Sequence, residues 1–196
     1  MIRLGLTGSI ATGKSTVLAA FADLGIPVFS ADEAVHRLYS GRAVEPVEQL
    51  FPGVARAGSI DRAALSRILI AHPERIAELE AVVHPLVREE VRGFLDDAEQ
   101  AGAALGVVDI PLLFESGFDY GLDAVAVTEA PMDVLRRRAL GRPGMSVEKL
   151  DTILARQLPQ EEKRKRADYR IDTSGTPEQA RAQVGKLVAH LRSGTQ

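Results

Sequence analysis

Nine residues near the N-terminus, Gly8–Thr16, constrain the fold more than any other stretch of the chain. They match the pattern G-x-x-x-x-G-K-[ST], they follow an apolar run at residues 2–7, and they lead into sequence of helical character. Glycines at the fixed positions allow a tight turn whose main-chain N–H groups, with the N-terminus of the next helix, surround phosphate oxygens. Lys14 adds a positive charge for the outer phosphates, and the Ser15 hydroxyl is placed to bind a magnesium ion that bridges them. The motif therefore predicts a strand, a phosphate-binding loop and a helix.

Composition limits the class of protein further. The 196 residues suit one ordinary domain, and the formal net charge of -3 argues against nucleic acid or an anionic membrane surface as a partner. Because there is no cysteine, disulfides and thiolate metal sites are excluded. No apolar run reaches about 18 residues and no signal-peptide pattern is seen. We therefore expect a cytoplasmic protein. A monomer is the favoured expectation, but the sequence leaves the oligomeric state open.

Short apolar runs separated by helix-period sequence predict an α/β fold with a parallel β-sheet flanked by helices. The expected strands are Leu4–Thr7, Pro27–Ser30, Ala104–Ile110, Ala124–Thr128 and Tyr169–Asp172. After the phosphate-binding loop, Lys14–Leu24 is expected to form a helix that ends at Gly25. Ligands of such sheets bind beyond the carboxyl ends of the strands, so functional residues are expected just after each strand.

The segment between the second and third expected strands has no strand signal and is longer than a simple crossover requires. This indicates a helical insertion. Within it, apolar residues recur at helical spacing in Asp61–Ala71, Pro73–Val83 and Pro85–Ala101. Because proline suits the first turn of a helix, we expect a break near His84.

A second unusual segment concentrates positive charge in an acidic chain. Its basic residues include Arg136, Arg137, Arg138, Arg142, Arg156, Lys163, Arg164 and Lys165. A solvated surface is the ordinary explanation of such a segment. Beside a phosphate-binding loop, however, phosphoryl transfer requires cations over the transferring group. Arg138 and Arg142 are four residues apart and are expected to share a helix face.

The end of the second expected strand supplies a candidate base. Asp32 lies just past this strand, near the start of a helix, on the side of the sheet where ligands bind. One interpretation is a helix N-cap. The other is a carboxylate that accepts the proton of an attacking hydroxyl, as an aspartate does in kinases.

Taken together, these stretches resemble the dephospho-CoA kinase family, in family order and over nearly the whole chain. The resemblance is carried by Leu6–Ile10, Lys14–Thr16, Ser30–Asp32, His84–Leu86, Asp109–Glu115, Arg138, Arg142 and Ala167–Asp172. The segments Ser30–Asp32 and Pro111–Glu115 are more specific than the loop, which many kinases share. The resemblance implies a P-loop kinase fold and magnesium-dependent transfer of phosphate from ATP to the ribose 3′-hydroxyl of dephospho-CoA, giving coenzyme A and ADP.

The resemblance also implies roles for individual residues. ATP would be bound by Gly8, Ala11, Thr12, Gly13, Lys14, Ser15 and Thr16, and the acceptor by Asp32, His84, Arg88, Asp109, Leu113 and Glu115. Asp32 would be the general base, and Lys14, Arg138 and Arg142 would stabilise the transferring phosphoryl group. Ser15 and Asp109 are the candidate magnesium ligands, although Asp109 could instead place the acceptor. A histidine before proline, such as His84, also serves as a cap or packing residue.

The family pattern divides the chain into a core, an acceptor-binding insertion and a lid. The core would comprise residues 1–30, 104–135 and 168–196, the helical insertion residues 31–103, and the helical lid residues 136–167. The chain departs from the family pattern at Ser30, where an aspartate is common, and at Thr173, where an asparagine is common. The second departure leaves the adenine contacts near residues 172–175 open.

Other functions fit parts of the sequence. A P-loop kinase for another small alcohol or nucleoside monophosphate has the same loop, and a panel of acceptors would distinguish it. An ATP-dependent switch is a second alternative, whereas a guanine-reading switch with Asn-Lys-x-Asp is excluded because the chain has no asparagine. A nucleic-acid binder is disfavoured because the basic residues are confined to one segment.

Overall fold

The computed structural model describes residues 1–193, and it confirms the predicted α/β fold with a parallel sheet. Residues 194–196, the end of the expected core segment, lie outside the described residues. The sheet has five strands in the order β2-β5-β1-β6-β7. Their bounds are Ile2–Gly8 (β1), Val28–Ser30 (β2), Leu105–Asp109 (β5), Ala124–Glu129 (β6) and Tyr169–Asp172 (β7).

The central position of β1 brings the ends of several strands to the phosphate-binding loop. It pairs in parallel with β5 and with β6, so that Leu6 is in register with Asp109 and Gly8 with Thr128. All five residues of β5 are buried, as expected for a parallel strand covered on both faces. Residues that follow β1, β5 and β6 therefore lie at one edge of the sheet.

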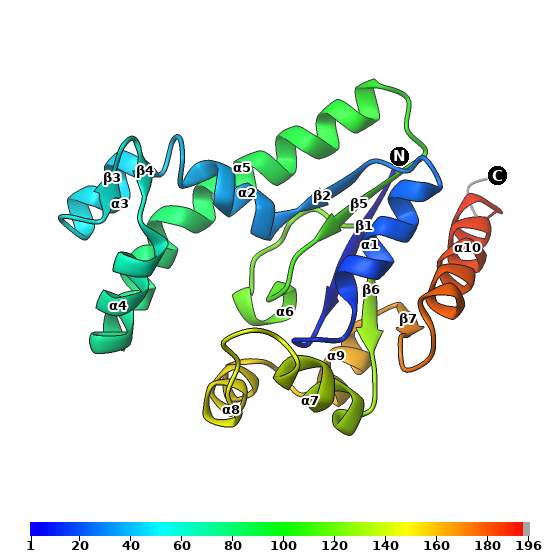
Figure 1. The fold of residues 1–196 in the computed structure, drawn as a ribbon. Coiled ribbons are helices and arrows are strands. Elements are labelled where there is room, and N and C mark those ends of the chain that lie inside the picture. Colours follow the sequence, from blue (N-terminus) through cyan, green and yellow to red (C-terminus); the bar gives the residue numbers. More distant parts are fainter. Residues whose placement is uncertain (194–196) are drawn as a thin grey trace. The chain divides into compact units, whose positions relative to one another are not determined.

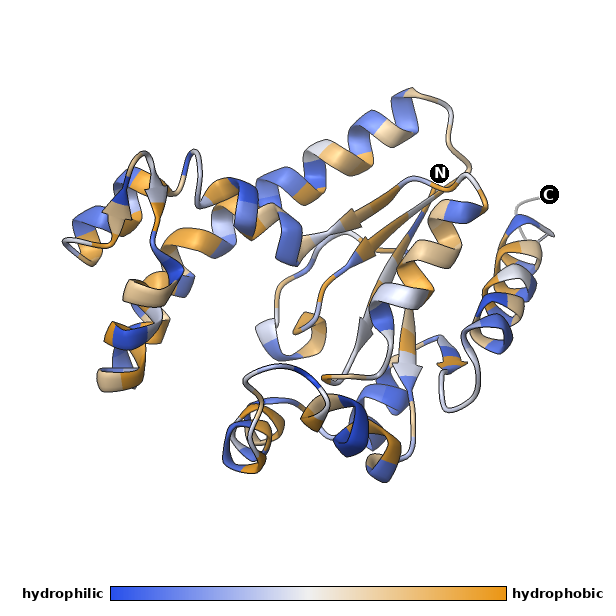
Figure 2. Cartoon of the chain, in the orientation of Figure 1, coloured by the Kyte–Doolittle hydropathy of each residue, from blue (hydrophilic) through white to orange (hydrophobic). Residues whose placement is uncertain are grey.

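Helices α1 (Lys14–Asp23) and α10 (Pro177–Ser193) lie side by side on the sheet (Figure 1). The strands are mostly hydrophobic, whereas the helices carry both polar and apolar residues (Figure 2). One core cluster on this side of the sheet consists of Leu4, Leu6, Val17, Ala20, Phe21, Ile26, Leu105, Val107, Ala126, Ile171, Ala180, Val184, Leu187, Val188 and Leu191. This cluster fixes α1, and with it the phosphate-binding loop, on the sheet.

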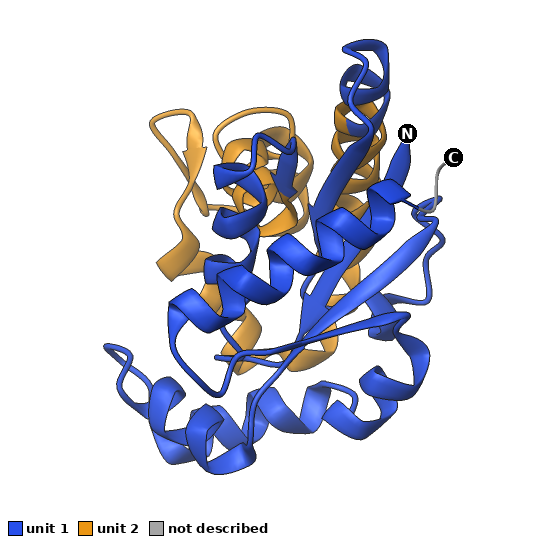
Figure 3. Ribbon diagram, turned by 90° about the vertical axis from the view of Figure 1, so that its right-hand side faces the viewer, with its two compact units in different colours: residues 1–29, 95–196 blue, residues 30–94 orange. Residues whose placement is uncertain are grey.

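Four further helices belong to the same compact unit, which comprises residues 1–29 and 95–193 of the described chain (Figure 3). They are α6 (Leu113–Ser116), α7 (Met132–Leu140), α8 (Val147–Arg156) and α9 (Gln160–Arg166). No helix within residues 1–193 combines the length and the hydrophobicity needed to cross a membrane.

Residues 30–94 form the second compact unit. It contains α2 (Ala31–Leu38), α3 (Val44–Leu50), the two-residue strands β3 (Ala55–Arg56) and β4 (Ser59–Ile60), α4 (Arg62–Ala71), the short 3-10 helix Pro73–Arg75 and most of α5 (Ile76–Gln100). Asp61 caps α4 by accepting a hydrogen bond of 2.9 Å from the Ala64 N–H. This bond to the charged form lowers the pKa of Asp61.

Two expectations for the insertion are wrong. It contains a small antiparallel hairpin, β3–β4, where no strand was expected; two-residue strands are too short to produce an alternating pattern. The expected break near His84 is absent, because α5 runs through Pro85 without interruption. Proline removes one helical donor, but the buried face formed by Val83, Val87 and Val91 continues across it and favours one long helix.

Candidate active site

The phosphate-binding loop connects β1 to α1 with the backbone geometry that the motif predicts. Gly13, the N-cap of α1, has φ 79°, and Ala11 has φ 61°, which is uncommon for a residue with a side chain. Thr16 and Val17 both donate to the Gly13 carbonyl, at 3.1 and 3.3 Å, and begin the hydrogen bonding of α1. Main-chain N–H groups before this point have no acceptor within the helix and are suited to binding an anion.

Three buried threonines from three segments hold the loop. The Thr12 hydroxyl donates to the Ser9 carbonyl at 2.7 Å and lies 2.7 Å from the Thr128 hydroxyl at the end of β6. Thr173, just after β7, donates to the carbonyls of Thr12, at 2.6 Å, and Glu129, at 3.0 Å. Thr173, where the family commonly has asparagine, is thus a support of the loop.

Gly8 is required because neighbouring atoms occupy the space of a side chain. A Cβ at this position would lie 2.1 Å from the Thr128 hydroxyl and 2.9 Å from the Thr128 carbonyl oxygen. We expect Gly8→Ala to lower the free energy of unfolding by about 1–3 kcal/mol, because the strand would have to move, and to weaken phosphate binding. Denaturant unfolding and nucleotide titration would measure both effects.

Gly185→Ala in α10 is the matched control. A Cβ there would meet no atom within 4 Å, and the position lies in a regular helix. We expect this change to stabilise the protein by about 0.5–1 kcal/mol, because alanine loses less backbone entropy in a helix than glycine. Equal stability of the two variants would contradict the steric role of Gly8.

Lys14, the first residue of α1, lies beside a carboxylate at the end of β5. Its ammonium is 2.8 Å from Asp109 Oδ1, and the two side chains are 14% and 8% exposed. In a site this shielded, the carboxylate holds the ammonium in place more strongly than it would in water. A bound phosphate would compete with Asp109 for Lys14.

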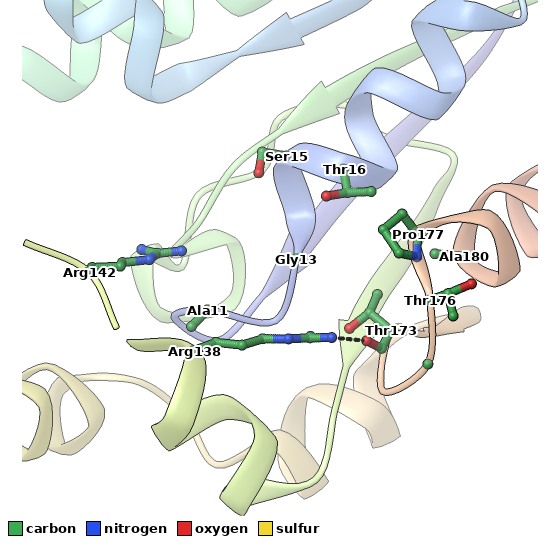
Figure 4. Close-up of a pocket in the computed structure, with 11 residues that line it drawn as sticks. Ala11, Gly13, Ser15, Thr16, Arg138, Arg142, Thr173, Thr176, Pro177 and Ala180 are labelled. Carbon is green, nitrogen blue, oxygen red and sulfur yellow. Dashed lines mark hydrogen bonds between the residues drawn. The ribbon is translucent and has the colours of Figure 1, made fainter. Parts of the chain in front are cut away.

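A cavity of about 300 Å³ adjoins the loop and contains both arginines that the sequence singled out (Figure 4). It is lined by Ala11, Gly13, Ser15, Thr16, Arg138, Arg142, Thr173, Gly175, Thr176, Pro177 and Ala180. Arg138 donates to the Thr173 carbonyl at 2.7 Å. Since a guanidinium has five N–H donors, further donors of Arg138 can serve an anion. The cavity therefore combines a phosphate-binding loop with two positive side chains.

The expectation that the two arginines share a helix face is wrong. Helix α7 ends at Leu140 with Gly141 as its C-cap, so Arg138 lies in its last turn and Arg142 in the segment that follows. The Arg142 N–H donates to the Ala139 carbonyl at 3.0 Å, which turns the chain at this point. Arg142 therefore reaches the cavity from the turn after α7, and not from the face of a continuous helix.

The loop between β7 and α10 forms the far wall of the cavity, and two polar side chains fix it. The Asp172 carboxylate accepts a hydrogen bond of 2.8 Å from the Ser174 N–H, which lowers the pKa of Asp172. Gln183 of α10 accepts from the Asp172 N–H at 2.9 Å and donates to the Asp172 carbonyl at 2.7 Å. These contacts order the segment that carries Gly175 and Thr176.

In the unit of residues 30–94, the structure tests one of the two interpretations of Asp32, that it is a helix N-cap. The N-cap of α2 is Ser30, whose hydroxyl accepts from the Glu33 N–H at 3.3 Å. Asp32 is the second residue of α2 and is exposed, so the N-cap interpretation is wrong. Ser30, a departure from the family pattern, thus has a structural role that leaves Asp32 available for chemistry.

The other candidate acceptor residues lie in different settings. His84 and Arg88 are one turn apart on α5 and both are partly exposed. Leu113 is buried, and its Cδ2 would be 3.2 Å from a Cβ on Gly5 of β1. Glu115 of α6 accepts a hydrogen bond of 2.8 Å from the Leu158 N–H.

Sequence reasoning missed the contacts of two residues in the segment 157–163. Gln157, between α8 and α9, accepts a hydrogen bond of 3.0 Å from the Ile10 N–H. Lys163 was grouped with the exposed basic residues, but it is fully buried and pairs with Glu115 at 2.8 Å. Its position between Glu162 and Arg164 in a highly charged helix gives no signal of burial.

Comparisons with known proteins agree with this geometry. A sequence model of the family described as Dephospho-CoA kinase matches residues 2–179. A dephospho-CoA kinase of Brucella melitensis is 53% identical over 191 residues, which cover 97% of this chain and 96% of the relative. A Thermus thermophilus protein of known structure aligns with a TM-score of 0.81 at 37% identity, over 97% of each chain. A dephospho-CoA kinase structure from Campylobacter jejuni aligns with a TM-score of 0.75 at 28% identity, over 99% of this chain and 98% of that one.

Proposed function

Since the chain belongs to the dephospho-CoA kinase family, we propose that it transfers the terminal phosphoryl group of ATP to the ribose 3′-hydroxyl of dephospho-CoA. The products are coenzyme A and ADP. The observation that carries this proposal is the cavity in which the phosphate-binding loop meets Arg138 and Arg142. Such a combination of N–H donors and cations suits a transferring phosphoryl group.

Different residues of this chain have different roles in the proposed reaction. Loop N–H groups and Lys14 bind the phosphates of ATP, and Arg138 and Arg142 stabilise the charge that spreads over the transferring group. Asp32 orients the 3′-hydroxyl and accepts its proton as the new O–P bond forms and the bond to ADP breaks. Residues 136–167 serve as a lid that excludes water and so limits hydrolysis of ATP.

The donor set fits a magnesium ion that is held mainly by the nucleotide. Within residues 1–193, no group of three or more His, Asp or Glu side chains could hold a metal by itself. Ser15 and Asp109 offer the hard oxygen donors that Mg²⁺ prefers, and one or two protein ligands are usual for Mg²⁺ bound with ATP. When bound, the ion would neutralise charge on the phosphates of ATP.

ADP release by the purified protein tests the proposal. With Mg²⁺ and ATP present, we expect release to depend on dephospho-CoA, and we expect chelation of Mg²⁺ to abolish it. A panel of small alcohols and nucleoside monophosphates is the control. Faster turnover of any of these acceptors would replace dephospho-CoA as the substrate, and release without an acceptor would indicate an ATPase instead.

A further inference from the structure

The linker between α8 and α9, residues 157–159, contacts two other segments of the chain: the phosphate-binding loop after β1 and helix α6 after β5. The Gln157 side chain accepts a hydrogen bond of 3.0 Å from the Ile10 N–H in the phosphate-binding loop. The next residue, Leu158, donates its N–H to Glu115 Oε1 at 2.8 Å. Two consecutive residues thus contact the nucleotide loop after β1 and helix α6 after β5.

Lys163 of α9 contacts the same carboxylate oxygen. Its ammonium lies 2.8 Å from Glu115 Oε1; the Lys163 side chain has no exposed surface and that of Glu115 is 14% exposed. Within the described residues, neither the Lys163 Nζ nor the Glu115 Oε2 has a hydrogen-bond partner of good geometry. The pair is therefore close and shielded from water, but incompletely satisfied.

Such a pair contributes little net stability, because burying both charges costs free energy of hydration. Both charges lose their hydration, and the attraction between them compensates fully only when the remaining hydrogen-bonding groups are also satisfied. Replacing both charges with uncharged groups of similar size is often neutral or stabilising. What the pair does provide is a fixed position for Glu115 and for the linker.

A hydrophobic cluster joins the nucleotide loop to the neighbouring lid helices. Ala11 of the loop packs with Leu135 and Ala139 of α7 and with Leu150 of α8. A displacement of α7–α9 would therefore shift the loop through this cluster and through Gln157. It would shift α6 through Leu158 and Lys163.

We propose that Gln157 and Lys163 are positioning residues for phosphoryl transfer, which join the nucleotide loop and Glu115 to one lid segment. Gln157 orders the Ile10 end of the loop for ATP. Lys163 and the Leu158 N–H hold Glu115, which the family resemblance assigns to acceptor binding, so that the acceptor and the phosphoryl group meet in a fixed geometry. The inference rests on the proposed function.

The test of the Lys163–Glu115 pair removes both charges and keeps the linker contact. In the double variant Lys163→Met/Glu115→Gln, the amide oxygen of the new side chain can still accept from Leu158. We expect the melting temperature to stay within a few degrees of wild type, the Kd for ATP to be unchanged, and kcat to fall at least about tenfold because the acceptor is misplaced. If the pair were merely structural, kcat would stay at the wild-type value.

The matched control is Lys165→Met/Glu162→Gln. This lysine and glutamate are 2.9 Å apart, and both lie on α9, the helix of Lys163. Their side chains are 60% and 44% exposed, so the control pair is not shielded from water. We expect wild-type kcat. Wild-type kcat in the Lys163/Glu115 variant, or an equal loss in the control, would overturn the proposed role of the Lys163–Glu115 pair.

Gln157→Ala provides an independent measurement that requires no phosphoryl transfer. We expect the Kd for a fluorescent ATP analogue to rise about three- to tenfold, because the Ile10 N–H loses its acceptor. An unchanged Kd would overturn the role of Gln157. It would also overturn the proposal that one lid segment positions both the loop and Glu115, even if the Lys163 double variant did not fold. If the wild-type protein bound the analogue but did not phosphorylate dephospho-CoA, the proposed function would fail while the Gln157 measurement kept its meaning.

Discussion

Asp32→Asn is expected to lower kcat by about 10²- to 10⁴-fold and to leave the Kd for ATP unchanged. Asparagine has the shape of aspartate but cannot accept the proton of the 3′-hydroxyl. The structure makes this a clean substitution, because Asp32 is exposed and the start of α2 is capped by Ser30. Steady-state kinetics, nucleotide titration and circular dichroism would separate a loss of chemistry from a loss of folding.

The matched control for Asp32 is Glu33→Gln, which removes the neighbouring carboxylate. Both residues lie in the first turn of α2, where a negative charge stabilises a helix by a few tenths of a kcal/mol. The Glu33 main-chain contact with Ser30 is independent of its side chain. We expect wild-type kcat in this control. If Asp32→Asn turned over at a rate within about tenfold of wild type, Asp32 would not be the base.

The parts of the fold that sequence predicted well depend on local patterns. The glycines at positions 8 and 13 allow the tight turn of the loop, and the short apolar runs of β1, β5 and β6, bounded by turn signals, favour buried strands. Pro85 shows the limit of such reasoning. Its local preference favours a helix start, but the burial of the α5 face outweighs that preference, and burial depends on tertiary contacts that spacing does not reveal.

The candidate site divides in the same way. Arg138 and Arg142 line the cavity with the loop, although the local geometry of Arg142 was predicted wrongly. The burial of Lys163 could not be predicted, because the sequence Glu-Glu-Lys-Arg-Lys-Arg is typical of a solvent-exposed helix. Its burial depends on Glu115, a residue far away in the sequence, and no periodicity encodes which carboxylate a lysine meets in the folded chain.

Lys14→Met should cost both activity and stability, for two different reasons. Under the proposed function, removal of the ammonium takes away a charge that stabilises the transferring phosphoryl group, and we expect kcat/KM to fall about 10²- to 10³-fold. It also takes away the cation 2.8 Å from the shielded Asp109 carboxylate. We expect the free energy of unfolding to fall by about 3 kcal/mol, because the shielded Asp109 carboxylate loses the cation that lies beside it.

Lys14→Arg separates the two effects. Arginine keeps a positive charge beside Asp109, so most of the stability should be retained, as denaturant unfolding would measure. Its planar guanidinium does not reproduce the compact ammonium within the tight loop, so kcat/KM should remain at least about tenfold below wild type. A variant with normal stability and normal kcat/KM would show that any cation suffices at this position. If instead Lys14→Met lost stability but kept its activity, Lys14 would be a structural partner of Asp109 and not a ligand of the transferring phosphate.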